Sequence, residues 1–340
     1  MKKIAVDILG GDNAPHAILD GVIQAAQTDK TIEFVLVGDK DQIQPAIDKN
    51  NLSSRVEIIH TTENISCDEQ PTTAIKGKPN SSIVLGLEAI KNREDCGAFV
   101  SAGSTGAVLT GAFLKVGRIK GVSRPALSPF FPTKIGKPVL VLDIGANMDC
   151  KPANLVHFAL MGNEYMKARG IENPRIALMN VGIEEAKGNE LTHATFPILQ
   201  KLHDEGKLNF LGNMEARDAF SGEYDVLVCD GFVGNVFLKT SEGAVSLLMY
   251  KVKQTMMSSF KTKIGALLVK KRLKKMKDEI GEEGAGGSIF LGIKKPVIKA
   301  HGNSSAYAFA NAIHLAKRST SVDLAEKITN ALDGLELPAD

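Results

Sequence analysis

Tryptophan is absent from this chain of 340 residues, and aromatic residues of all kinds make up only 5% of it. Proteins that bind single-stranded nucleic acids stack the bases on aromatic side chains, so this scarcity argues against such a role. The formal net charge is only +2, which gives no general attraction to a polyanion. We therefore expect no nucleic-acid partner.

Cysteine is scarce as well. The four cysteines stand far apart and form no CxxC pair: Cys67, Cys96, Cys150 and Cys229. Such spacing is typical of a reducing compartment and argues against a disulfide framework. No apolar run approaches the ~20 residues that a membrane span needs. The first strand pattern already begins at Lys3, so we expect no signal peptide and a cytoplasmic protein, soluble or at most attached to a membrane surface.

The chain does contain a regular alternation of strand patterns and helix patterns. Short apolar runs rich in β-branched residues predict strands at 3–9, 33–37, 55–60, 97–101, 138–143, 175–181, 208–212, 225–229 and 296–300. Helical patterns lie between them at 15–27, 83–92, 105–115, 153–169, 189–203, 234–258 and 304–317. Strands that are apolar on both faces are typical of a parallel sheet covered by helices on both sides. We predict an α/β fold, a three-layer α/β/α sandwich with a mostly parallel sheet.

The domain organisation follows from length and from one irregular stretch. We treat 1–340 as a single catalytic α/β unit, and its length leaves a division into two subdomains open. Residues 124–138 contain three prolines, which suits an edge strand or a crossing between subdomains better than a central strand.

A lysine-rich segment stands out near the C-terminal quarter. Residues 251–277 carry apolar side chains at helical spacing, namely Val252, Met256, Phe260, Ile264 and Leu267. We expect 251–287 to form a projecting basic amphipathic helical segment followed by a loop. Contact with a membrane surface and burial at a dimer interface are both open interpretations of this segment.

Six of the strand patterns end in a polar turn rich in glycine, asparagine or serine, and a helical pattern follows. The turns are Gly10 to Pro15, Ser101 to Gly106, Asp143 to Asn147, Lys187 to Glu190, Asp230 to Asn235 and His301 to Ser305. In an α/β sheet such turns gather at the carboxyl ends of the strands, where a crevice can bind a ligand. Glycine allows close backbone approach, and each helix start offers N–H groups to an anion. The pattern predicts an enzyme built around an anionic substrate.

Motifs along nearly the whole chain resemble the phosphate acyltransferase family of bacterial phospholipid synthesis. In the first half they are Gly10-Gly11-Asp12, Ser101-Ala102-Gly103, Gly117-Arg118-Ile119-Lys120-Gly121, Arg124-Pro125-Ala126-Leu127, Gly145-Ala146-Asn147 and Asp149-Cys150-Lys151-Pro152. In the second half they are Asn173-Pro174-Arg175, Lys187-Gly188-Asn189-Glu190-Leu191, Glu215-Ala216-Arg217-Asp218, Cys229-Asp230-Gly231-Phe232 and Ala300-His301-Gly302. Their order and joint presence make the resemblance specific. The chain departs from the family pattern at Ile8-Leu9, Asn13 and Ser104.

This resemblance implies a fold, a reaction and a set of partners. The fold would be similar to isocitrate and isopropylmalate dehydrogenase-like folds. The reaction would move a fatty acyl group from acyl carrier protein to inorganic phosphate, with no cofactor. The acyl phosphate would pass to a membrane glycerol-3-phosphate acyltransferase. The protein would be a homodimer, peripherally associated with the inner face of the cell membrane.

Transfer to phosphate makes modest demands on the protein. Phosphate can attack a thioester directly, so the enzyme must bind the dianion, aim it and stabilise the developing oxyanion. Lys187 is our preferred cation for this task, with a solvated loop lysine as the alternative. Asn235 and Asn189 either donate amide N–H groups to the carbonyl oxygen or cap helices. His301 either protonates the departing thiolate or has a structural role.

We therefore predict catalytic roles for Lys187, Asn235 and His301. The predicted substrate-binding residues are Gly10, Gly11, Asp12, Ser101, Gly103, Ser104, Thr105, Asn147, Asn189, Glu190, Asp230 and Gly231. Asp12, Asp143, Asp230 and Glu190 are candidates to orient the cations. No metal-ligand spacing is clear, and we expect no metal. A basic surface for acidic acyl carrier protein is expected at Lys115, Arg118, Lys120 and Arg124.

Other interpretations remain open at this stage. Cys150 could form an acyl-enzyme, although flanking charges alone do not activate a thiol. A nicotinamide-dependent dehydrogenase would share the fold class, but the first turn lacks GxGxxG. A membrane-bound adaptor without catalytic activity would sit on the membrane through segment 251–277 and recruit partners. Release of a thiol from an acyl thioester in the presence of phosphate separates these possibilities.

Overall fold

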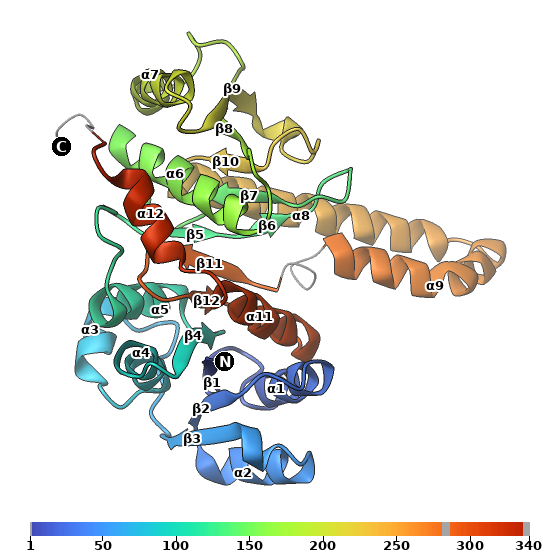
Figure 1. Cartoon of the computed structure of the whole chain (residues 1–340). Helices are drawn as coiled ribbons and strands as arrows, with labels where there is room; N and C mark the ends of the chain where they lie inside the picture. The colour runs from blue at the N-terminus through green and yellow to red at the C-terminus, as the bar shows by residue number, and fades with distance from the viewer. Residues whose placement is uncertain (1, 281–285, 336–340) are drawn as a thin grey trace.

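The computed structural model describes residues 2–280 and 286–335, and Figure 1 shows that its strands gather in two sheets flanked by helices. The larger sheet has the order β3-β2-β1-β4-β12-β11-β5. Its strands are β3 (Val56–His60), β2 (Phe34–Gly38), β1 (Lys3–Asp7), β4 (Cys96–Ser101), β12 (Val297–Lys299), β11 (Ser288–Leu291) and β5 (Ala126–Ser128). All neighbours pair in parallel except β11, which is antiparallel to both β12 and β5.

The smaller sheet has the order β6-β7-β10-β8-β9. Its strands are β6 (Phe130–Phe131), β7 (Val139–Leu142), β10 (Val226–Val228), β8 (Arg175–Asn180) and β9 (Asn209–Glu215). Only β6 is antiparallel to its neighbour. The predicted α/β fold with a mostly parallel strand arrangement is confirmed.

Helices connect the parallel strands as the sequence predicts. They are α1 (His16–Thr28), α2 (Lys40–Lys49), α3 (Pro71–Gly77), α4 (Ser82–Asn92), α5 (Thr105–Gly111), α6 (Pro152–Ala168), α7 (Glu190–Asp204), α8 (Gly231–Met256), α9 (Phe260–Ile280), α11 (Ala306–Ser319) and α12 (Leu324–Leu332). A π-helical stretch continues α5 over Ala112–Val116. Each strand and helix predicted from the sequence has a counterpart within a few residues, whereas β5, β6, β11, α2, α3 and α12 were not predicted as separate elements.

The proline-containing stretch 124–138 joins the two sheets. It forms β5 at the end of the larger sheet and β6 at the end of the smaller one, with Pro129 between them. Backbone hydrogen bonds link it to the β7 region, because Val141 N donates to Pro129 O at 3.1 Å and Ile144 N donates to Leu127 O at 3.2 Å. The expectation of an edge strand or a crossing is confirmed here.

The strand pairing also fixes the relative direction of the two sheets. Strand β5 runs in the direction of β12, because both pair antiparallel with β11. The β5–β6 stretch is in turn antiparallel to β7. The parallel strands of the smaller sheet therefore run opposite to those of the larger sheet where the two are joined.

The apolar strand patterns are buried as expected for strands covered on both faces. Every residue of β2 and β7 is buried, and so is every residue of β4 and β10. Phe34, Phe99, Phe158, Phe290 and Phe309 are among the largest fully buried side chains. This core fixes the strand ends that carry the polar turns.

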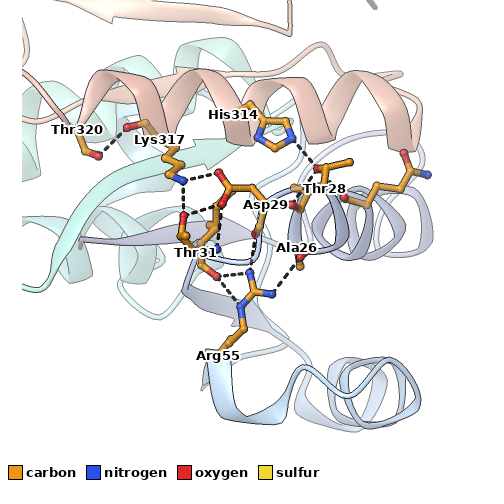
Figure 2. A network of polar contacts seen from close by, with 11 residues as sticks. Ala26, Thr28, Asp29, Thr31, Arg55, His314, Lys317 and Thr320 are labelled. Carbon is orange, nitrogen blue, oxygen red and sulfur yellow. Dashed lines mark hydrogen bonds and ion pairs between the residues drawn. The ribbon is translucent and has the colours of Figure 1, made fainter.

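A polar network ties α11 to the end of α1, as Figure 2 shows. The Lys317 ammonium bonds to the Asp29 carboxylate, and His314 Nε2 lies 3.0 Å from Thr28 Oγ1. The Lys317 hydrogen bond is the main reason that the pKa of Asp29 falls well below its usual value. Arg55 donates to three backbone carbonyls at the same end of α1, those of Ala26, Asp29 and Ile32.

Helices α8 and α9 form a hairpin that projects from the body of the molecule (Figure 1). Residues 251–280 of this segment comprise the end of α8, a short turn and α9. The expected loop at 281–287 lies outside the described residues for 281–285. Several large apolar side chains of the hairpin are exposed, namely Leu247, Leu248, Tyr250, Met257, Phe260, Ile264, Leu267 and Leu268.

Candidate active site

The six polar turns form two clusters. The first turn cluster contains residues 10–15, 101–106 and 301–305, which follow the neighbouring strands β1, β4 and β12. The second turn cluster contains residues 143–147, 181–190 and 230–235, which follow β7, β8 and β10.

The expectation that all six turns gather around a single crevice stays a prediction. The sequence shows the turns but not the order or the direction of the strands. The β5–β6 stretch lies beside strand ends of both clusters. Ser128 is level with Ile298 of β12 through β11, and the Leu127 N–H donates to Asp143 Oδ1, at the end of β7, at 2.9 Å. The predicted catalytic residues are distributed over both clusters. His301 lies in the first turn cluster, whereas Lys187 and Asn235 lie in the second.

The Asp7 carboxylate holds two turns of the first turn cluster together through hydrogen bonds. This carboxylate is fully buried at the end of β1 and accepts hydrogen bonds from the N–H groups of Leu9 and Gly10, both at 3.1 Å. Ser101 donates its hydroxyl to the same carboxylate at 2.6 Å and accepts the N–H of Gly103 at 3.0 Å. Burial raises the pKa of Asp7, and these hydrogen bonds oppose that shift.

The glycines of the first turn cluster are explained by close packing. A Cβ on Gly10 would lie 2.3 Å from Asp7 Oδ2 and 2.7 Å from Gly103 N. A Cβ on Gly11 would lie 2.9 Å from both Ala102 Cβ and Gly302 O. These turns therefore interlock, and the backbone cannot accept a side chain at either position.

The other predicted residues of the first turn cluster sit at its rim. Asp12 is exposed, and its N–H donates to Gly302 O at 2.7 Å. Ser104 caps α5, and the neighbouring Thr105 is exposed. His301 is exposed, with Nδ1 lying 2.7 Å from Asn303 Oδ1. Sequence reasoning did not select Lys299, which is buried below this cluster with its ammonium 3.4 Å from Ala102 O.

Asp143 organises the second turn cluster in a similar way. Its buried carboxylate accepts the N–H groups of Leu127 at 2.9 Å, Ala146 at 3.2 Å and Asn147 at 2.6 Å. Burial raises the pKa of Asp143, and these backbone bonds oppose the shift. The Asn147 amide donates to Pro125 O and Asp143 Oδ2, and Gly231 N donates to Asn147 O at 2.8 Å. Asn147 thus connects the ends of β7 and β10.

The start of α8 completes this connection. Asp230 caps the helix by accepting the N–H of Val233 at 2.8 Å. Asn235, in the first turn of α8, donates Nδ2 to Ile144 O at 3.2 Å. A Cβ on Gly234 would lie 1.9 Å from Asp143 O, which explains the glycine at that position.

Lys187 lies beside the end of β8. The Asn180 amide donates to Lys187 O at 2.9 Å, so the turn folds back onto the strand end. Strand register places Leu178 of β8 level with Val228 of β10, so this turn starts beside the beginning of α8. Lys187 itself is exposed, as are Asn189 and Glu190. Asn189 caps α7 by accepting the N–H of Thr192 at 3.0 Å, so the capping alternative is observed.

Exposed apolar side chains belong to the same turns as Lys187 and Asn235. Val181 and Ile183 precede Lys187 and are 76% and 65% exposed. Phe232 and Val236, at the start of α8, are 63% and 50% exposed. Sequence reasoning missed this feature, because each residue continues an apolar strand or helix pattern and only the fold shows that it faces solvent.

The cysteines offer no activated thiol. Burial raises the pKa of Cys150 to about 12, and the negative charges of Asp143 and Asp230 add to the shift. Cys229 and Cys96 are buried, and burial raises the pKa of each. Cys67 is exposed but lies in neither turn cluster. The acyl-enzyme interpretation of Cys150 thus loses support, because a nucleophile must be a thiolate.

The basic residues expected to dock acyl carrier protein have mixed environments. Lys115 already pairs with Glu88 at 2.9 Å. Arg118 packs over the ring of Phe113 at 4.9 Å, and Arg124 donates weakly to Asp149 O at 3.5 Å. Arg118, Lys120 and Arg124 are exposed.

Comparison with solved structures places the fold in a defined class. Phosphotransacetylases from Staphylococcus aureus and Streptococcus pyogenes align with TM-scores of 0.58, at 17% and 18% identity, over 96% of this chain and 94% of theirs. A Salmonella typhimurium protein described as a 4-hydroxythreonine-4-phosphate dehydrogenase aligns with a TM-score of 0.52 at 14% identity, over 94% of this chain and 99% of that one. At these identities the likeness concerns the fold alone. The chain is an α/β protein of the fold shared by phosphotransacetylases and this dehydrogenase type.

Sequence comparison identifies the family. A family model described as "Fatty acid synthesis protein" matches residues 2–327. Proteins named phosphate acyltransferase from Exiguobacterium sibiricum and Thermoanaerobacterium thermosaccharolyticum are each 45% identical. The matches cover 96% and 97% of this chain and 98% and 97% of those proteins. The chain belongs to this phosphate acyltransferase family.

One further finding concerns membranes. Among residues 2–280 and 286–335, no helix combines the length and the apolar character that crossing a bilayer requires.

Proposed function

We propose that this protein transfers a fatty acyl group from acyl carrier protein to inorganic phosphate, making an acyl phosphate for membrane phospholipid synthesis. The observation that carries the proposal is the nearly full-length match, at 45% identity, to relatives named phosphate acyltransferase. The family description, which refers to fatty acid synthesis, supports a fatty acyl group as the cargo.

We assign the reaction to the second turn cluster. Fatty acyl transfer to phosphate needs a cation for the anion and an apolar surface for the chain. The second turn cluster offers both, because Lys187 is exposed in the same turn as Val181 and Ile183. The first turn cluster is more tightly interlocked, and its glycines are accounted for by packing. Contact of substrate with Gly10, Gly11, Ser101 or Gly103 therefore stays a prediction.

The proposed chemistry is direct attack by phosphate. The Lys187 ammonium holds the phosphate dianion, and an oxygen of phosphate forms a bond to the thioester carbon. The remaining Nδ2 hydrogen of Asn235 donates to the oxyanion of the tetrahedral intermediate. The C–S bond then breaks, and the thiolate takes a proton from water, which is an easy step for a thiol of pKa ~8.5. His301 lies in the first turn cluster, and its role in proton transfer stays a prediction.

Three further proposals concern partners. The exposed Arg118, Lys120 and Arg124 support docking of an acidic carrier protein. The exposed apolar residues Leu247 and Leu248 on α8 support pairing with a second copy of the chain. The exposed apolar and basic residues of α9 support contact with the inner membrane surface, where a glycerol-3-phosphate acyltransferase would take up the product.

The test is release of thiol from acyl-acyl carrier protein with and without phosphate. We expect thiol release to depend on phosphate, and to fall about 100-fold or more in Lys187→Ala, since removal of one charge-stabilising group typically costs that much. Lys201→Ala, which removes an exposed lysine of α7, is the matched control and should keep full activity.

Each contrary result has a definite meaning. Full turnover in a folded Lys187→Ala variant would remove Lys187 from the mechanism. Absence of phosphate-dependent thiol release from the unaltered protein would reject the proposed function and favour an adaptor. Hydride transfer to a nicotinamide cofactor would instead revive the dehydrogenase interpretation.

A further inference from the structure

A second cationic site lies where helices of the two sheets meet. It is a solvent-connected cavity of about 280 Å³ between the end of α6, the end of α11 and the start of α12. We call it the two-arginine pocket, and its lining residues are Tyr165, Ala168, Arg169, Arg318, Ser319, Ser321, Val322 and Leu324. In Figure 1, α12 crosses α6 in this part of the molecule. None of these residues belongs to either turn cluster.

Arg169 and Arg318 bring two guanidinium groups to this pocket. Among residues 2–280 and 286–335, neither Arg169 nor Arg318 forms an ion pair with a carboxylate. Arg169 lies over the rings of Phe130 at 4.5 Å and Tyr165 at 5.8 Å, which holds its plane in place. Burial lowers the pKa of Arg318, and the positive charge of Arg169 lowers it further. Two cations thus share one cavity, and no carboxylate of the described residues pairs with either of them.

The pocket also contains a nearly buried hydroxyl group, that of Tyr165. Tyr165 is only 4% exposed, and its hydroxyl lies beside the Arg169 guanidinium and the Ser319 hydroxyl. A hydroxyl in this position can donate a hydrogen bond to a water or a ligand in the pocket. Ser319 and Ser321 already donate their hydroxyls to backbone carbonyls, which leaves Tyr165 and the arginines as the donors of the pocket.

Helix geometry alone does not account for this arrangement. Arginines near helix C-termini interact favourably with the helix dipole, and Arg169 and Arg318 each stand at such an end. The dipole effect places one arginine on each helix, but it does not favour bringing both into one cavity, where like charges repel. An anion between them removes that repulsion.

We propose that the two-arginine pocket binds the dianionic group of a small phosphate monoester. The guanidinium groups of Arg169 and Arg318 can donate several N–H hydrogen bonds to the oxygens of a phosphate group. The two negative charges of the phosphate balance the two positive charges of the arginines. Val322 and Leu324 give the pocket an apolar side that suits a short organic substituent. Because α6 packs on the smaller sheet and α11 on the larger, a bound ligand would fasten the two sheets together.

The experiment is calorimetric titration of the full-length protein with glycerol 2-phosphate. We expect one equivalent to bind, with affinity at least tenfold weaker in Arg318→Gln and in Arg169→Gln. Arg272→Gln, on the projecting hairpin, is the matched control and should bind as the unaltered protein does. Tyr165→Phe removes only the hydroxyl and should weaken binding about threefold or more, which keeps the test valid if an arginine variant fails to fold.

A second arm separates a soluble ester from a lipid headgroup. Vesicles that contain phosphatidic acid present the same phosphate chemistry, and Arg318→Gln should sediment with them as the unaltered protein does. Equal binding of glycerol 2-phosphate by all variants, or no binding by the unaltered protein at 10 mM, would overturn the proposal. Loss of vesicle binding in Arg318→Gln without loss of the soluble ester would overturn it as well.

Discussion

At Gly10 the backbone of the first turn cluster leaves no room for even one methyl group. A Cβ there would lie 2.3 Å from Asp7 Oδ2 and 2.7 Å from Gly103 N, and the second of these atoms is backbone that cannot rotate away. The Asp7 carboxylate would have to move, and with it the hydroxyl of Ser101. The interlocked turns therefore depend on glycine for steric reasons.

We predict that Gly10→Ala lowers the free energy of unfolding by about 1–3 kcal/mol, the usual cost of overpacking a buried site. Gly77→Ala is the matched control, because a Cβ at the end of α3 would meet nothing within 4 Å, and it should change stability by less than ~0.5 kcal/mol. Urea unfolding of both variants measures the difference. Equal stability of the two variants would show that the turns are not interlocked as described.

Some residue roles could be predicted from the sequence, and others could not. Glycine and asparagine at strand ends could be recognised from the sequence, because their turn chemistry is local. The role of Ser101 could not, because its hydroxyl is used by Asp7 on a different strand. Likewise, the exposure of Val181 and Phe232 depends on which strands are neighbours. It could not be predicted, because an apolar residue contributes to the same sequence pattern whether it lies in a core or at a surface.

The α8–α9 hairpin is the clearest case at the scale of elements. Its helical spacing was readable from the sequence, and the structure adds which apolar residues face outward. Phe260 is 79% exposed and Leu268 is 81% exposed, beside the lysines of α9. A large exposed apolar surface with a basic border is typical of contact with an anionic membrane surface.

Replacement of Phe260 and Ile264 by Asp should abolish sedimentation with anionic liposomes, because it removes apolar contact and adds charge repulsion. Thiol release in solution should remain unchanged, since Phe260 and Ile264 lie outside the second turn cluster. Ile135→Asp, at an exposed apolar position outside the hairpin, is the matched control and should sediment normally. Normal sedimentation of the hairpin variant would discard membrane contact by this element.

For the whole molecule, the fold class was predictable and the division into two sheets was not. Alternating apolar strands and helices define an α/β protein through local periodicity alone. Strand order and direction depend on long-range pairing through β11 and the short β5–β6 stretch, which carries too few residues to give a pattern. For that reason the sequence could not show that Lys187 and His301 follow strands of different sheets.

Direct detection of the product is the most direct test of acyl transfer to phosphate. Phosphorus NMR of a mixture of acyl-acyl carrier protein, inorganic phosphate and this protein should show an acyl phosphate resonance that grows in step with free thiol. Loss of thioester with only fatty acid and unchanged phosphate as products, or no loss at all, would contradict the account.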